Sequence, residues 1–419
     1  MSLKKFFGDR KIVIRTVLFI VFFATAITAF TIGVINLAGN KEGYQTIEAE
    51  HSEEAPFYSK DFTFKYYFTG SSGEIRDKRK AVTALYSTTL LRAYKLLDPE
   101  NTYDGFNNIA SLNKEKGCSI SVGDELYNVL KDAYLRTSEQ KGYNMFAGAL
   151  YDYVYSILIL EEPEAFDLVN DAEGAKRRDE LVKLAGEPSN FILSFEDDVN
   201  CTVSFNTSEI YDKAVEELES DAPALDLNLL KDAYILEIVG KTLAEAGYTD
   251  GYITSRSGLT VALSDREGME YCIYGLHSGQ TAILETLPSG SGAVFSAFKS
   301  FAFGAEDMYY TVDTDGRVIY RNPYISALDG YESDKYLSLY SVMTTGVSGS
   351  YEELARNLFA KHLCADTVYR NLRIWAEREE DTESAASVPA FGGAGGASGE
   401  YITLYVLQND TETVIRSNN

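Results

Sequence analysis

The feature that most constrains this chain is an uninterrupted apolar run near its N-terminus. Residues 16–38 read TVLFIVFFATAITAFTIGVINLA and contain no ionisable side chain. A helix needs about 20 predominantly apolar residues to cross the hydrocarbon core of a bilayer, because each peptide N–H must bond within the segment. We therefore predict a transmembrane helix over residues 16–38. A cleaved secretory signal is the alternative, although the apolar core of such a signal usually runs for only about 7 to 15 residues.

The charges that flank this run predict its orientation. Residues 1–15 carry five Lys and Arg side chains against one Asp, and an excess of positive charge keeps a flank in the cytoplasm. Residues 39–60 are polar, acidic and aperiodic, which is typical of a linker. We thus predict a cytoplasmic N-terminus at 1–15, a linker at 39–60 and an extracytoplasmic domain at 61–419. The predicted location is the cell membrane, with a single span.

Composition limits the partners of that domain. The whole chain has a formal net charge of −25, and its first 38 residues contribute five positive charges and one negative, which leaves −29 for the remainder. Nucleic-acid binding needs clustered Lys and Arg to displace counterions from phosphates, so we predict no nucleic-acid partner. With 30 Tyr, 22 Phe and 45% hydrophobic residues, the chain has ample apolar material for a packed core.

Cysteine and histidine give no motif. Cys118, Cys201, Cys272 and Cys364 lie far apart without CxxC or zinc spacing. Disulfides and free thiols both remain open, because an exported chain is able to form disulfides. The three histidines are widely separated, which supports neither a histidine metal cluster nor a Ser-His-Asp triad.

Hydrophobic periodicity predicts an α+β domain with one mixed or antiparallel sheet and packed helices. Apolar residues at spacings of three and four predict helices over 78–97, 123–141, 228–246 and 351–363, with Gly142 and Gly247 as C-terminal stops. Short β-branched and aromatic runs predict strands over 251–254, 259–263, 269–274, 307–312, 317–320, 336–343 and 401–407. A glycine-rich loop spans 388–400.

Four blocks, in this order, resemble the ApbE family of FAD:protein FMN transferases. They are residues 94–113, 225–247, 309–318 and 338–360, followed by a final strand from Tyr401. Members of that family are membrane-anchored or exported, and they join FMN through a phosphoester to Thr or Ser of a target protein. The resemblance implies an ApbE-like (T-fold-like) domain, FAD and Mg²⁺ as cofactors, and exported flavoproteins or other envelope proteins as partners.

The resemblance also implies site positions. Asp226, Tyr234 and Asp313 fall at cofactor-binding positions, and Glu352 falls at a metal-ligand position; no catalytic residue is assigned. Taken singly, carboxylates such as these are more often solvated or helix-capping groups than ligands.

Several other positions depart from the family pattern. Asn228 replaces the first glycine of a helix start that would approach a diphosphate. Asp232 replaces a Lys and reverses a charge that would face phosphate. Arg356 places a cation where a metal ligand is expected, which lowers metal affinity.

These departures favour a catalytically degenerate ApbE-like protein that acts as a binding or interaction module. The enzymatic alternative is an active Mg²⁺-dependent FAD:protein FMN transferase that attaches FMN to Thr or Ser of exported flavoproteins. A third hypothesis is an unrelated extracytoplasmic scaffold or sensor domain.

Overall fold

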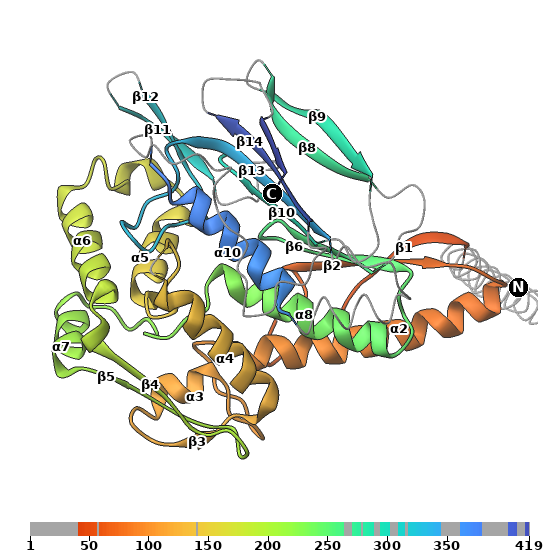
Figure 1. The fold of residues 1–419 in the computed structure, drawn as a ribbon, viewed down its shortest axis with the longest axis horizontal. Helices are drawn as coiled ribbons and strands as arrows, with labels where there is room; N and C mark the ends of the chain where they lie inside the picture. The colour runs from red at the N-terminus through yellow and green to blue at the C-terminus, as the bar shows by residue number, and fades with distance from the viewer. Residues whose placement is uncertain are drawn as a thin grey trace, which may run out of the picture.

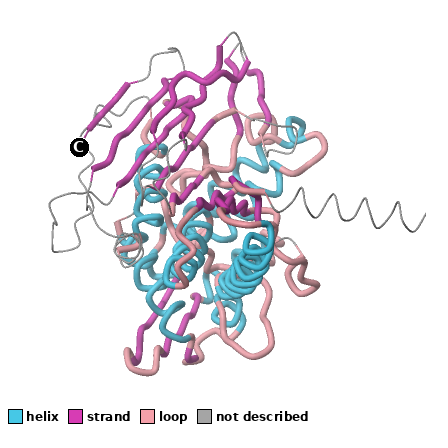
Figure 2. The backbone as a smooth tube through the Cα atoms, turned by 90° about the vertical axis from the view of Figure 1, so that its right-hand side faces the viewer, coloured by secondary structure: helices cyan, strands magenta, loops and turns pink. Residues whose placement is uncertain are grey.

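The computed structural model describes residues 41–56, 58–139, 141–263, 270–277, 280–288, 294–301, 309–314, 317–344, 361–378, 401–408 and 415–418. In these segments a large sheet is covered by helices, and a second group of helices with a small sheet lies beside it (Figure 1). Figure 2 shows the strands of the large sheet gathered above the helices. The predicted α+β class is confirmed.

The main sheet has eight strands in the order β1-β2-β6-β7-β10-β13-β14-β15, and every pairing between neighbours is antiparallel. Strand β2 shows why these sequences form strands, since Phe62, Phe64, Tyr66 and Phe68 alternate with less buried residues and point to one face. The strands are β1 (Gly43–Ile47), β2 (Phe62–Phe68), β6 (Gly251–Ser255), β7 (Leu259–Ala262), β10 (Val294–Lys299), β13 (Tyr336–Thr344), β14 (Tyr401–Gln408) and β15 (Ile415–Asn418).

Three helices cover the inner face of this sheet: α2 (Ser72–Leu96), α8 (Leu229–Glu245) and α10 (Leu363–Trp375). Helix α8 packs between α2 and α10, and α10 lies against β10 and β13 (Figure 1). Helix α2 begins six residues before the predicted start at 78. The reason is a capping box, in which Ser71 and Glu74 satisfy each other's backbone N–H groups.

A second group of elements lies beside this layer, at the lower left of Figure 1. Its core contains a stack of aromatic rings, in which Phe146 lies 4.9 Å from Phe191 and 5.8 Å from Phe205 between ring centroids. The group comprises α3 (Ile109–Lys114), β3 (Ile120–Ser121), α4 (Gly123–Ser138), α5 (Gly148–Leu158), η1 (Pro163–Phe166), α6 (Ala172–Gly186), η2 (Pro188–Asn190), β4 (Phe191–Asp197), β5 (Thr202–Thr207) and α7 (Glu209–Glu217).

Two hairpins complete the described structure. Hairpin β8–β9 (Glu270–His277 and Gln280–Pro288) packs on the outer face of the main sheet, where the Tyr271 ring stacks on Phe295 with centroids 4.8 Å apart. Hairpin β11–β12 (Tyr310–Thr314 and Arg317–Arg321) pairs only within itself among the described strands.

The predicted linker at 39–60 is corrected by the structure. Residues 43–47 form β1, which pairs with β2 along its whole length, and Ile47 and Tyr58 are 2% and 1% exposed. Alternating polar residues in GYQTI hid this strand, because a strand at the edge of a sheet buries few side chains.

The predicted membrane span at 16–38, the glycine-rich loop at 388–400 and most of the predicted helix at 351–363 lie outside the described residues. Among the helices that are described, none combines the length and apolarity needed to cross a membrane. The glycine stop at Gly247 is confirmed, since it directly follows the C-cap of α8 with a left-handed φ of 79°. The stop predicted at Gly142 is wrong, because α4 already ends at Ser138 with Glu139 as its C-cap.

Candidate functional site at the start of α8

Two of the ApbE-like blocks meet at the start of α8. Asn113, from the 94–113 block, clamps the loop before the helix through two hydrogen bonds with Leu225. Its Nδ2 donates to the Leu225 carbonyl and its Oδ1 accepts from the Leu225 N–H, both at 2.9 Å. The Asp226 N–H donates to the Met145 carbonyl at 2.8 Å. The path of the chain into α8 is therefore fixed from two sides.

Lys231 is the cation at the centre of this site. Its Nζ lies 5.4 Å from the centroid of the Tyr94 ring. Burial alone lowers the pKa of Lys231, but the negative charges around it, Asp226 foremost and then Asp232 and Asp98, raise that pKa above its usual value. The ammonium group stays protonated and offsets part of a local excess of negative charge.

The carboxylates around Lys231 are held partly out of water. Burial raises the pKa of Asp226, and Lys231 and the Asn228 N–H oppose that shift. Burial raises the pKa of Asp232 to about 6, against the lowering effect of Lys231 and of hydrogen bonds from Ser257 and Ser255. Ser255 ends β6 and Ser257 lies in the β6–β7 turn, so the structure brings this turn to the first residues of α8.

Three of the backbone donors at the start of α8 are already used within the chain. The Asn228 N–H donates to Asp226 Oδ1 at 2.8 Å, the Leu230 N–H to the Leu227 carbonyl at 3.1 Å, and the Lys231 N–H to the Asn228 carbonyl at 2.9 Å. Free N–H groups at a helix N-terminus bind phosphate, and a nearby carboxylate opposes it. This helix start is therefore largely closed against an anion, because Asp226 takes one donor and its charge repels the anion.

The other predicted site residues do not join this cluster. Tyr234 is fully buried, and its hydroxyl donates to Asp132 Oδ2 of α4 at 2.6 Å. Asp313 is exposed on β11, and within the described part of the chain its side chain forms no hydrogen bond or ion pair. Glu352 lies outside the described residues. The predicted set is thus not brought together by the residues that the structure describes.

A divalent metal does not fit the carboxylates seen here. The Asp98 carboxylate is occupied by four donors: the N–H groups of Glu100 and Asn101, the Asn101 side chain and the Tyr103 hydroxyl. Among the described residues, no group of three His, Cys, Asp or Glu side chains is placed to hold a metal. All four cysteines are free, which answers the question left open by the sequence.

The sequence analysis missed a buried ion network at the β11–β12 hairpin. Arg321 donates through Nε and Nη2 to both oxygens of Asp167, at 2.7 and 2.9 Å, and through Nη1 to Glu332. The Tyr310 hydroxyl donates to Asp167 Oδ2 at 2.8 Å, and burial raises the Tyr310 pKa well above its usual value. Asp167 and Arg321 lie 154 positions apart in the sequence. No local sequence pattern could therefore reveal this network.

Comparison with known proteins gives structural neighbours only. No protein-family model and no curated protein sequence matches the chain. The ApbE protein of Thermotoga maritima is 11% identical, covering 89% of this chain and 97% of its own, with a TM-score of 0.48. A flavin transferase ApbE from Vibrio cholerae is 12% identical with the same coverage and a TM-score of 0.47. These neighbours belong to the family that the sequence blocks resemble, and at such identity the likeness concerns the fold alone.

Proposed function

We propose that this chain is a catalytically degenerate flavin-transferase-like protein, which acts as a binding or interaction module anchored outside the membrane. The observation that carries the proposal is the closed start of α8. There Asp226 takes the backbone N–H of Asn228, and Asp232 occupies the position at which the ApbE resemblance implies a phosphate-facing Lys. A diphosphate that binds here would have to displace the Asp226 carboxylate from the Asn228 N–H, and the negative charge of that carboxylate would repel it.

The loss of these contacts would weaken the binding of a diphosphate strongly. Each charge-assisted hydrogen bond to phosphate contributes roughly 1.5 to 3 kcal/mol, so the loss of two or three weakens binding by about a hundredfold or more. The rival proposal, an active Mg²⁺-dependent FMN transferase, draws on Asp313, whose carboxylate is open to solvent and free to take a ligand.

A transfer assay separates the two proposals. The full chain would be incubated with FAD, Mg²⁺ and an exported flavoprotein that carries a flavinylation sequence, and covalent FMN would be read by fluorescence in a denaturing gel. We expect no transfer above the blank, while an active flavin transferase labels the same target under the same conditions. Robust Mg²⁺-dependent transfer that disappears in Glu352→Ala would instead establish the enzyme.

A further inference from the structure

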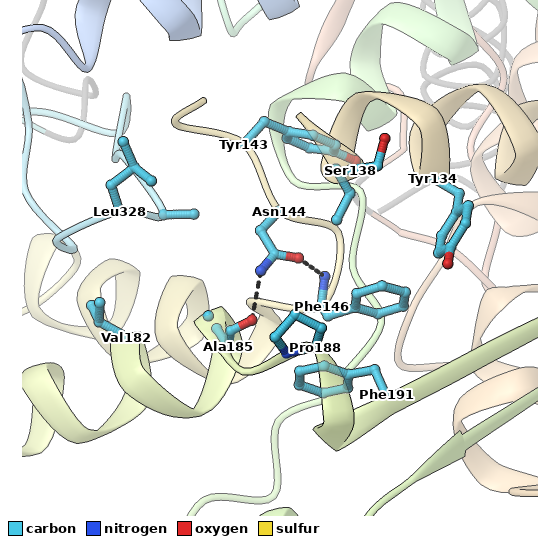
Figure 3. Close-up of a pocket in the computed structure, with 13 residues that line it drawn as sticks. Tyr134, Ser138, Tyr143, Asn144, Phe146, Val182, Ala185, Pro188, Phe191 and Leu328 are labelled. Carbon is cyan, nitrogen blue, oxygen red and sulfur yellow. Dashed lines mark hydrogen bonds between the residues drawn. The ribbon is translucent and has the colours of Figure 1, made fainter. Parts of the chain in front are cut away.

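A cavity of about 370 Å³ opens between the C-terminal ends of α4 and α6 and the start of β4 (Figure 3). The loop before α5 and residues 327–328 close its remaining sides. None of the 13 residues that line it carries a charge. Its volume lies within the range of about 300 to 1,000 Å³ that is typical of small-molecule sites.

Three polar side chains in the cavity wall are engaged with the protein, whereas the buried Tyr143 hydroxyl has no hydrogen-bond partner among the described residues. Asn144 donates through Nδ2 to the Ala185 carbonyl at 2.7 Å and accepts at Oδ1 from the Phe146 N–H at 2.9 Å. Thr137 Oγ1 accepts from a backbone N–H at 3.0 Å, and the Ser138 hydroxyl donates to a backbone carbonyl at 2.6 Å. A ligand therefore meets mainly carbon surface.

Aromatic rings form one side of the cavity. Phe146 and Phe191 stack with an interplanar angle of 8°, and Tyr134 meets Phe146 edge-on with centroids 6.3 Å apart. In Figure 3, Val182 and Leu328 stand across the cavity from these rings. Packing at the Phe146 ring, which also stacks on Phe205, makes this wall rigid.

The electrostatics of the cavity disfavour an anion. Ala185 and Gly186, from the end of α6, line it, and the C-terminal end of a helix carries partial negative charge. The chain as a whole carries a net charge of −25. An anionic ligand would therefore lose hydration without gaining a cationic partner.

We propose that this cavity binds an uncharged apolar compound of two or three aromatic rings. The site is built from residues other than those at the start of α8, so the inference does not rest on the proposed function. Transfer activity and ligand binding in this cavity are separately measurable.

Two fluorescent probes test the charge preference. N-phenyl-1-naphthylamine is uncharged, and 1-anilinonaphthalene-8-sulfonate is the same molecule with one sulfonate added. We expect the full chain to bind the uncharged probe saturably, with one molecule per chain, and the sulfonate at least about tenfold more weakly. Equal or tighter binding of the sulfonate would overturn the proposal.

A matched pair of glycine variants locates the site. A Cβ built at Gly186 or at Gly73 meets no atom within 4 Å, and neither residue has positive φ. Gly186→Phe adds a ring to the lining of the cavity, whereas Gly73→Phe places the same ring on the exposed first turn of α2. Both variants are titrated with the probe at the same protein and detergent concentrations. Any signal from probe in detergent micelles is then the same for both and cancels in the comparison.

We expect Gly186→Phe to weaken binding of the uncharged probe at least about tenfold, and Gly73→Phe to bind like the wild type. Equal binding by all three proteins would place the probe elsewhere and refute the site. Leu328→Lys keeps the test decisive if Gly186→Phe does not fold, since Leu328 is 53% exposed and tolerates a polar side chain. This variant should gain affinity for the sulfonate, and an unchanged ratio between the probes would count against the proposal.

Discussion

Asp232 and Lys231 show how two adjacent residues decide what the start of α8 is able to bind. Burial raises the pKa of the Asp232 carboxyl to about 6, while Lys231 and the hydroxyls of Ser257 and Ser255 limit the shift. A carboxylate in this state is costly to keep ionised. The ionised Asp232 carboxylate therefore destabilises the folded chain at neutral pH, unless a partner supplies a cationic group beside it.

This cost has a definite pH dependence. The unfolded chain loses the Asp232 proton near the usual value of about 3.9, whereas the folded chain keeps it to about pH 6. Between these values the folded state binds more protons, so this group lowers the free energy of unfolding as pH rises.

Asp232→Asn removes the ionisation and keeps an acceptor for the serines. We expect it to stabilise the chain by about 1 to 2 kcal/mol at pH 7.5, and to change little at pH 4.5. Urea unfolding of the full-length wild type and variant at both pH values measures the difference. A stabilisation of the same size at both would show that Asp232 does not titrate in this window.

At the scale of elements, a buried ionic pair fastens the first turn of α10 to α8. Glu237 is 4% exposed; its Oε2 lies 2.7 Å from His362 Nδ1, and its Oε1 accepts from the Ala365 N–H at 3.1 Å. His362 has φ 50° and ψ 46°, a left-handed conformation that the pair helps to hold. Burial lowers the pKa of His362, but the hydrogen bond and the charge of Glu237 outweigh burial, so the pKa is raised overall. Two more distant charges have smaller effects: Asp132 raises this pKa and Arg136 lowers it.

His362→Asn tests this fastening, because Asn accepts left-handed φ but cannot pair as a cation. A raised histidine pKa means that the stabilisation is fully present below about pH 6.5 and is lost as pH rises through the folded-state value. We expect a loss of about 1.5 to 3 kcal/mol at pH 6 and a smaller loss at pH 9. His362→Gly, which relieves the backbone without the pair, is the control.

The elements also show what the sequence could predict. Apolar spacing predicts helices α2, α4 and α8. Helices α2 and α4 bury one face, whereas α8 is buried on all sides from Ala233 to Gly240. Helix α5 was missed, since GALYDYVYSIL is apolar on most sides and has no polar cap at its start. Among the site residues, Asp226 was placed at the start of α8. Its role in closing that start depends on a bond to Asn228 that only the backbone conformation reveals.

At the scale of the whole molecule, strand β1 shortens the connection between the predicted membrane anchor and the folded domain. The predicted span ends at residue 38 and β1 begins at Gly43. Residues 39–42 bridge at most about 14 Å when fully extended. The edge of the main sheet is therefore expected to lie at the membrane surface, and not at the end of a long stalk.

This arrangement gives a prediction for topology. With the basic residues 1–15 in the cytoplasm, a C-terminal fusion to a reporter that is active only outside the cytoplasm should be active, and a reporter that needs the cytoplasm should be silent. The full chain should remain in the membrane fraction after washing with carbonate or high salt, because about 20 apolar residues anchor a helix against both treatments. Replacing two apolar residues at the centre of 16–38 by Asp, at a cost of about 2.5 to 3.5 kcal/mol each, should release or mislocalise the chain. Recovery of the wild type as a soluble species that begins near Asn40 would show that 16–38 is a cleaved signal.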